Sequence, residues 1–456
     1  MNGMCCGRAA AARSGCRRED ILRDYLLFGL VFGAFPFILW RPHIGIVLWC
    51  VFSYMNPHRY SWGLAYDFPF AAVIAGATFA GLLLSREPKR IPWNGLTYIW
   101  TVFILWMCFT TLFALVPVDA FHEWDRSMKI QLMTFVTLMV ITSRERLNAL
   151  IWVIVFSLGF FGVKGGIFTI LSHGEDMVFG PPDSFIAGNN SLALALVMIF
   201  PLMRYLQLNT ESRLLRLALT GTMALSTLAV LASYSRGAFL AIAAMGIFLF
   251  LKGRKKAMVL LVALVLIPPV LAFMPEKWYE RIETIRTYKE DASALGRINA
   301  WWFAYNLAKD RPLIGGGFAT FDPQLFKRYA PDPDDFHDSH SIYFEVLAEH
   351  GFVGLALFLT LGFLTFRCAG RTIQLARDRP EFNWARDLAA MMQVSMIGFA
   401  VGGTFLGLAY FDLYYHLIAI ALITYGLVER VVADTAAATL PGDGALVQAV
   451  LGDGKR

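Results

Sequence analysis

The feature that most constrains this chain of 456 residues is a succession of long apolar segments separated by short links. Thirteen segments can be delimited, at 26–39, 44–56, 67–85, 94–116, 127–142, 148–171, 190–207, 214–232, 236–252, 257–273, 341–366, 389–408 and 411–429. Hydrophobic residues make up 57% of the chain and charged residues 16%, more apolar surface than a soluble protein of this size can bury. We therefore expect an all-α, polytopic transmembrane helical bundle, surrounded by membrane lipids.

Positive charge gathers in every second link. The links after residues 85, 142, 207, 252 and 366 carry Arg86, Lys89, Arg90, Arg144, Arg146, Arg213, Arg216, Arg254, Lys255, Lys256, Arg367, Arg371, Arg377 and Arg379. Because Lys and Arg are retained on the cytoplasmic side, these links are predicted to be cytoplasmic and the links between them to face outward. The net charge of +6 then reports membrane orientation, and no nucleic acid is expected as a partner.

Both ends of the chain are predicted to be cytoplasmic, with a basic tail at 1–25 and a second tail at 431–456. Two cytoplasmic ends require an even number of spans. The two short runs within 26–56 would each be only about 20 Å long as helices, so we count them together as one bent or re-entrant pass. This interpretation gives about 12 spans, distributed over 26–273 and 341–430.

Residues 274–340 are predicted to form one long outward-facing loop. Within it, Ser293–Lys309 has the pattern of an amphipathic helix lying at the membrane interface, with the aromatic residues Trp301, Trp302, Phe303 and Tyr305. Asp310-Arg311-Pro312 should end this helix, and Gly315-Gly316-Gly317 should form a turn that admits a close backbone approach.

Several cations occupy outward-facing or apolar positions, where positive charge is otherwise avoided. Arg236 begins the segment 236–252, Arg297 begins the loop helix, and Lys164 interrupts the segment 148–171. Each could contact an anionic substrate, or simply reach the membrane interface or solvent with a long side chain. Further candidates for substrate binding are Lys129, near the outer end of its segment, and Asn189 and Asn190, for which N-capping is the alternative.

Acidic residues and histidines crowd the end of the long loop and the start of the next segment: Asp332, Asp334, Asp335, His337, Asp338, His340, Glu345 and Glu349. His340 lies where the loop meets the membrane, and an imidazole with a pKa of about 6.5 can accept a proton at neutral pH. Glu345 could orient that imidazole, and His337 could contact substrate. Such ligands could also hold a metal, but no second ligand cluster recurs, so we expect no metal and no cofactor. His416 is a further candidate, with a buried hydrogen-bonded role as the alternative.

The sequence after His340 has a recognisable spacing. Nine residues separate His340-Ser341 from Gly351, and Gly354 follows. This pattern, His-[Asn/Ser/Gln]-x9-Gly-x2-[Gly/Thr/Tyr], resembles the signature of bacterial O-antigen ligases in the wider O-antigen ligase/polymerase superfamily. Ser235-Arg236-Gly237 resembles the Ser-Arg-Gly segment of the same superfamily. Four stretches of the first half look like a branch of O-glycosylation ligases linked to exosortase systems: Ser53-Tyr54-Met55-Asn56-Pro57-His58-Arg59, Asp67-Phe68-Pro69-Phe70, Lys164-Gly165-Gly166 and Gly180-Pro181-Pro182.

The resemblance implies an enzyme of the bacterial inner membrane whose long loop is periplasmic. It implies a glycan donor linked to undecaprenyl pyrophosphate, and an acceptor that is lipid A–core oligosaccharide or another glycan or protein. The residues suit this chemistry. Arg236 and Arg297 can neutralise the departing pyrophosphate without a metal, and His340 can remove the proton of the acceptor hydroxyl. Direct attack from the opposite face would invert the anomeric carbon.

Three alternatives remain open at this stage. An O-antigen or exopolysaccharide polymerase and a protein O-oligosaccharyltransferase would use the same donor. A polysaccharide transporter would share the helical bundle, but should show broken helices and polar sites near the bilayer midplane. The candidate polar residues gather at the outward face instead, so transport is the weaker hypothesis.

Overall fold

The computed structural model describes residues 9–61, 63–252 and 292–438, and every regular element in these ranges is helical. The long helices are α1 (Ala9–Trp40), α3 (Phe70–Leu84), α4 (Gly95–Thr111), α5 (Pro117–Val140), α6 (Arg144–Leu171), α7 (Asn189–Asn209), α8 (Arg213–Leu231), α9 (Arg236–Lys252), α12 (Ala292–Asp310), α14 (Ile342–Leu375), α15 (Asn383–Gly402) and α16 (Asp412–Ala438). The short ones are α2 (Pro42–Cys50), η1 (Val51–Met55), η2 (Pro57–Tyr60), α13 (Pro323–Tyr329), η3 (Pro380–Phe382) and η4 (Gly403–Phe405). The all-α prediction is confirmed.

Seven of the described helices are long and apolar enough to cross a membrane: Leu22–Trp40 of α1, then α6, α7 and α8, then α14, the stretch Pro380–Phe405, and Asp412–Thr435 of α16. Pro42–Met55, Phe70–Leu84 and Gly95–Thr111 are apolar but shorter. The number of such helices indicates a multi-pass membrane protein. The count of about 12 spans stays a prediction, and the predicted segment 257–273 lies outside the described residues, as do residues 274–291 of the long loop.

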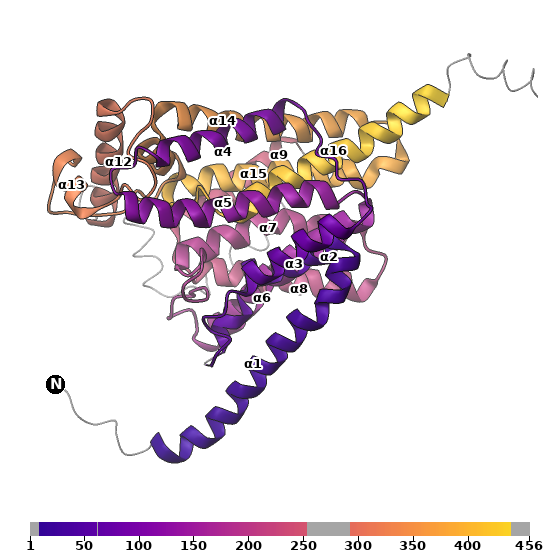
Figure 1. Cartoon of the computed structure of the whole chain (residues 1–456), viewed down its shortest axis with the longest axis horizontal. Coiled ribbons are helices and arrows are strands. Elements are labelled where there is room, and N and C mark those ends of the chain that lie inside the picture. The colour runs from indigo at the N-terminus through magenta and orange to yellow at the C-terminus, as the bar shows by residue number, and fades with distance from the viewer. Residues whose placement is uncertain (1–8, 62, 253–291, 439–456) are drawn as a thin grey trace, which may run out of the picture.

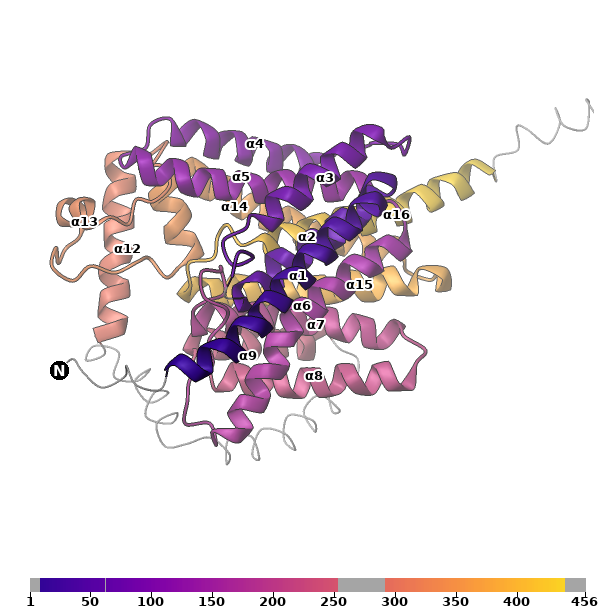
Figure 2. The ribbon, with the colours of Figure 1, turned by 60° about the horizontal axis from the view of Figure 1, so that its bottom comes forward.

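The long helices run side by side around α7, which packs against α6, α8, α9 and α15 (Figure 1). Two ends of this bundle can be distinguished. The site end carries α12, α13 and the segments 56–69, 172–188, 311–341 and 403–411. The basic end carries the links 85–94, 141–143 and 376–382, with Arg144 and Arg146 directly after the second of them, and α16 leaves the bundle there. Figure 2 shows α12 crossing the ends of the bundle helices at the site end.

The region 26–56, predicted to be a bent or re-entrant pair, folds as an antiparallel hairpin of α1 and the stretch Pro42–Met55, and its count as one pass stays a prediction. At the site end, Arg23 Nη1 donates to the carbonyl oxygen of Tyr60 at 3.3 Å. At the basic end, a Cβ at Gly81 of α3 would meet the Ile38 carbonyl oxygen. The chain therefore reaches the basic end along α1, turns at Arg41 and returns. The described start of α1 and the end of α16 consequently lie at opposite ends of the bundle (Figure 1), and the predicted cytoplasmic location of both termini stays a prediction.

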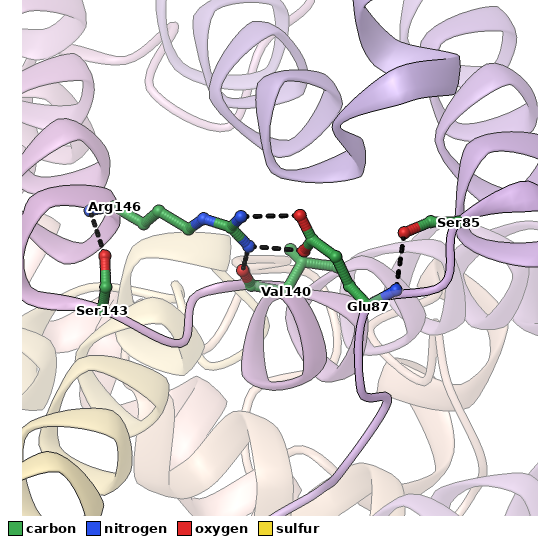
Figure 3. Close-up of polar contacts among 5 residues, drawn as sticks. All are labelled: Ser85, Glu87, Val140, Ser143 and Arg146. Carbon is green, nitrogen blue, oxygen red and sulfur yellow. Dashed lines mark hydrogen bonds and ion pairs between the residues drawn. The ribbon is translucent and has the colours of Figure 1, made fainter.

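The links at the basic end are held by an ion pair. Arg146 Nη1 and Nη2 donate to the two carboxylate oxygens of Glu87 at 2.6 and 2.7 Å, and Nη1 also donates to the Val140 carbonyl oxygen at 2.8 Å (Figure 3). The Arg146 hydrogen bond keeps the pKa of Glu87 below its usual range. This two-pronged contact joins the link after α3 to the start of α6, so one of the arginines that predict orientation also has a structural role.

The predicted loop helix exists as α12, and its four aromatic residues do not share one exposed face; its position at a membrane interface stays a prediction. Trp301 Nε1 donates to the Ser339 carbonyl oxygen at 2.8 Å, and Phe303 is fully buried against Phe326 of α13. Only Trp302 and Tyr305 of the four predicted aromatic residues are exposed. A short turn and α13 pack on α12, so half of its aromatic surface forms a small core of its own.

Candidate active site at the site end of the bundle

His340 is held in an unusual backbone conformation at the start of α14. Its φ angle is 41°, a left-handed value that is uncommon for a residue with a side chain and is concentrated at functional sites. The side chain is half-buried. Burial lowers the pKa of His340 below its ordinary value; the Asp338 carboxylate raises it, and the charges of Arg297 and His337 lower it again. The imidazole is therefore held in its neutral, proton-accepting form over a wider pH range than in solution.

The spacing between His340 and the two motif glycines has a structural reason. α14 consists of two helical parts, because Gly351 has a φ of 68° and a ψ of −171°, which only glycine adopts readily. A Cβ at Gly351 would also collide with the Leu313 carbonyl oxygen, and one at Gly354 would collide with the side chain of His350. The signature thus encodes a short helix, Ile342–His350, that begins after His340 and ends at a kink.

The predicted glycine turn completes this short helix. Gly316 and Gly317 donate their backbone N–H groups to the carbonyl oxygens of Ala348 and Glu349, both at 2.8 Å. Helix ends leave such carbonyls without intrahelical partners, and here a loop satisfies them. The expected close backbone approach at 315–317 is confirmed, and its partner is the end of the helix that follows His340.

Two glutamates on the short helix hold the surrounding loops. Glu345 Oε2 accepts a hydrogen bond from the Ala409 N–H at 3.1 Å. Glu349 accepts one from the Ala319 N–H at 2.9 Å and one from the Tyr410 hydroxyl at 2.6 Å. The two carboxylates thereby attach the segments 318–319 and 406–411 to the helix that follows His340. The structure thus shows a contact of Glu345 with a loop, and its predicted contact with the His340 imidazole stays a prediction.

α12 brings Arg297 to the same place. A Cβ at Gly296 would lie 2.6 Å from the His337 ring, and the charge of Arg297 acts on His340. One turn further along, Trp301 stacks on Phe344 with ring centroids 5.0 Å apart. The predicted site residues Arg297, His337 and His340 therefore come from two chain segments that pack directly on each other.

Arg236 approaches from a third element. It is the first residue of α9, and a Cβ on the next residue, Gly237, would lie 3.2 Å from Cβ of Phe405. A Cβ at Gly403 would meet Ile342, two residues after His340, and the Phe405 ring lies 6.4 Å from that of Trp301. The turn η4 is therefore the point at which the starts of α9 and α14 meet the middle of α12.

An apolar groove begins directly beside His340. It has a volume of about 370 Å³ and runs between α14, α15 and α16. Ile342 and Tyr343 line its upper end, and Phe363 and Phe366 line it further down. We refer to this space as the α14–α15 groove. It offers an apolar surface that leads from the membrane-embedded part of the bundle to the histidine.

Four predicted substrate-binding residues lie elsewhere. His416 is fully buried and is hydrogen-bonded to Tyr54 at 2.8 Å, so the structure supports the alternative of a buried polar residue. Lys164 is exposed, with Nζ 4.7 Å from the centre of the Tyr60 ring. Asn189 donates to the Ser233 carbonyl oxygen at 2.8 Å and anchors the turn before Arg236, while the preceding Gly188 is the N-cap residue. Asn190 is half-buried in the first turn of α7, where its predicted role remains untested.

Lys129 belongs to a second and larger cavity, of about 600 Å³, which we call the α3–α5 cavity. Its lining comprises Trp49, Phe52, Ser53, Asn56, His58, Ala71, Ala72, Ala75, Gly76, Phe79, His122, Asp125, Arg126, Lys129, Ile130, Leu132, Met133, Asp183, Ser184 and Phe185. Sequence reasoning did not identify this cavity. The stretch from Ser53 to Arg59 does stand out in the sequence as a motif. The α5 residues and the loop residues that face it across the cavity are more than 60 positions further along the chain, so the sequence does not show that they meet.

The acidic residues and histidines between Asp332 and Glu349 do not gather around a common point in the part of the chain that the structure describes. His337 Nδ1 lies 3.1 Å from Asp335 Oδ1, but no three side chains of His, Cys, Asp or Glu come together in a way that could hold a metal ion within those ranges. The residues that could hold an anion are instead the arginines Arg236 and Arg297.

Two comparisons with known families cover most of the chain. Residues 22–211 match a family of unknown function (DUF5935). Residues 221–359, which include Arg236, Arg297, His340 and Gly354, match the family described as O-Antigen ligase. No curated protein matches the chain. This match to residues 221–359, together with the His340 signature, supports the resemblance of the chain to the O-antigen ligase superfamily.

Proposed function

We propose that this protein is an inverting glycan transferase of the O-antigen ligase type. It moves a glycan from undecaprenyl pyrophosphate to a hydroxyl of lipid A–core oligosaccharide at the periplasmic face of the inner membrane. The observation that carries the proposal is the meeting of α9, α12 and α14 at η4, because it gathers two arginines and a partly buried imidazole within the matched region.

In the proposed reaction each residue has one step. His340 accepts the proton of the acceptor hydroxyl as its oxygen attacks the anomeric carbon. The bond from that carbon to the pyrophosphate oxygen breaks, and the bonding electrons leave with the pyrophosphate. Arg236 and Arg297 stabilise the developing negative charge, each with two parallel N–H donors. His340 then releases its proton to solvent, and undecaprenyl pyrophosphate is the second product.

The α14–α15 groove supports the assignment of the donor. An undecaprenyl chain is a long apolar ligand that stays in the bilayer, and the groove joins the bilayer to the surroundings of His340. Binding the chain there would hold the pyrophosphate close to the reacting groups, which lowers the entropic cost of reaction.

The decisive test is transfer by the purified protein in proteoliposomes that contain the lipid-linked glycan and lipid A–core. We expect product to form at an undiminished rate in excess EDTA, since the arginines take the role of a metal. Loss of activity on chelation, with recovery on adding a divalent ion, would move the catalytic role to the stretch Asp332–Asp338.

Glycan analysis of a deletion strain separates the ligase from the polymerase. A ligase deletion removes long-chain lipopolysaccharide while the lipid-linked polymer is retained. Accumulation of single-repeat glycans would instead assign the protein as a polymerase.

A further inference from the structure

The α3–α5 cavity takes no part in the reaction steps assigned above. We infer that it binds the acceptor as a membrane-anchored glycolipid, with a hydroxyl-rich headgroup at its mouth and a lipid chain between α3 and α5. The inference rests on the proposed function, because it names the site of the second substrate. Four observations support it: the shape of the cavity, its charge, its backbone and its connection to His340.

The cavity changes from polar to apolar along its length. α3 and α5 both run from the site end to the basic end, so Asp125 and Lys129 lie nearer the outward surface than Met133, and Ala71 lies nearer than Phe79. The α3 wall is built of small residues, and a Cβ at Gly76 would meet nothing within 4 Å. A polar mouth above an apolar crevice at membrane depth fits an amphiphile with one end in lipid.

The charges at the mouth are balanced. Arg126 and Lys129 face Asp125 and Asp183, and Lys129 already pairs with Asp125. Burial lowers the pKa of His58 to about 4, with a smaller contribution from Arg59, so this imidazole adds no positive charge at neutral pH. Sugar hydroxyls can donate to the carboxylates and accept from the cations, so a hydroxyl-rich headgroup satisfies both.

The floor of the cavity has an irregular backbone of a kind often found at functional sites. Phe52 and Ser53 belong to η1, a single π-helical turn, and π turns inside helices are frequent at binding and catalytic sites. Asn56 follows with a left-handed φ of 48°. Nδ1 of His58 is buried without a hydrogen-bond partner among the described residues, which leaves one polar atom at the mouth for a ligand.

One loop connects the cavity with the site of transfer. The Arg126 guanidinium lies 3.5 Å from the centre of the Phe185 ring, and the Phe185 ring lies 6.2 Å from that of Phe411. Two residues before Phe411, the Ala409 N–H donates to Glu345 on the short helix that follows His340. A headgroup in the mouth would therefore contact Phe185, which packs on the loop that is hydrogen-bonded to the His340 helix.

The test fills the cavity with a side chain. Gly76→Phe projects a ring into open space, and Gly221→Phe is the matched control, because Gly221 is also a helical glycine with nothing within 4 Å and lies outside the cavity. In proteoliposomes with lipid A–core as acceptor, we expect Gly76→Phe to raise the acceptor KM by about tenfold or more. The donor KM and kcat should change by less than about twofold, and Gly221→Phe should leave all three values unchanged.

Binding is measured separately from transfer, by native mass spectrometry of the full chain with lipid A–core. Wild type and His340→Ala should retain the glycolipid, and Gly76→Phe should lose it. Bound glycolipid without transfer by wild type would reject the proposed function and leave the cavity assignment standing. Unchanged acceptor KM and retained glycolipid in Gly76→Phe would overturn the inference, as would a rise in the donor KM alone. If Gly76→Phe does not fold, the double variant Asp125→Asn/Lys129→Ala at the mouth of the cavity takes its place. We expect this variant to bind the glycolipid more weakly, and unchanged binding would overturn the inference.

Discussion

The two matched regions of this chain build polar sites in opposite ways. In residues 22–211, long helices stand apart and leave the α3–α5 cavity, whose charges are balanced and whose depth is apolar. In residues 221–359, short helices and turns crowd together and place arginines beside a partly buried histidine. The difference indicates that the first region suits the binding of an amphiphile, while the second suits the stabilisation of charge that develops during a reaction.

Left-handed backbone conformations occur in both regions, at Asn56 and Asp183 in the first and at His340 in the second. In the region with the arginines, His340 and Gly351 both have positive φ angles at the two ends of one short helix. Such conformations persist only where the surrounding contacts hold them, and here the glycine turn, the half-buried Glu345 and the buried Glu349 do so. Precise placement matters most for groups that move protons or neutralise charge, because small displacements there greatly reduce rates.

The largest expected effect comes from His340→Ala. Removing the base should lower kcat by roughly 10²–10⁴-fold, the usual contribution of a positioned acid–base group. The counterpart in the other region is His58→Ala, which should change the acceptor KM and leave kcat nearly unchanged. Steady-state transfer assays on both variants measure the contrast. Near-normal turnover by folded His340→Ala would break the comparison and promote His337 as the base.

The next effect concerns the arginines. Lysine keeps the positive charge but loses the planar pair of donors, so Arg236→Lys and Arg297→Lys should each lower kcat by about tenfold or more at saturating donor. Lys129→Ala, on the cavity side, should leave the donor KM unchanged. Full turnover by either lysine variant would show that the arginine in question does not clamp the pyrophosphate.

A smaller effect is expected on the pH dependence. His340 must be neutral to accept a proton, and its pKa is lowered, so activity should be retained as pH falls to the ordinary histidine range and lost below it. Asp338 raises this pKa, so Asp338→Asn should shift the acidic limb of kcat/KM to still lower pH. Asp183→Asn, at the mouth of the cavity, should not shift it. An unmoved limb in Asp338→Asn would contradict the assignment of that limb to His340.

The smallest effect lies at the far end of the bundle, away from both sites. Arg146→Lys loses the two-pronged contact with Glu87 and should lower the free energy of unfolding by about 1 kcal/mol or less, without changing kinetic constants. The pKa of Glu87 is lowered in the folded state, so this stabilisation is present above its unfolded pKa and lost as pH falls through the folded value. Thermal unfolding at several pH values, with Arg213→Lys as the control, measures the stabilisation by this contact and its dependence on pH. A changed acceptor or donor KM in Arg146→Lys would show that the two ends are coupled.

Much of the helical pattern could be predicted from the sequence, because apolar runs and their basic links follow simple rules. The helix from Ser293 to Lys309, the turn at 315–317 and the long helix after His340 were all predicted close to their observed bounds. The antiparallel pairing of α1 with Pro42–Met55 could not be predicted, because the lengths of two adjacent apolar runs do not show whether their helices continue in one direction or fold back on each other. The sequence also could not decide whether His416 is buried or contacts substrate, because its burial depends on neighbours on other helices.

The sequence by itself determined the fold class, the family signature and the set of polar residues from which a site could be made, since composition, local periodicity and short spacings are properties of neighbouring residues. Only the tertiary structure decided which of those residues meet. It brought α9, α12 and α14 together at η4, separated Lys129 and His416 from His340, and opened the α3–α5 cavity between residues as distant as Phe52 and Phe185. These outcomes depend on how long helices pack against one another, and packing is set by many weak contacts between distant segments that no single stretch of sequence encodes.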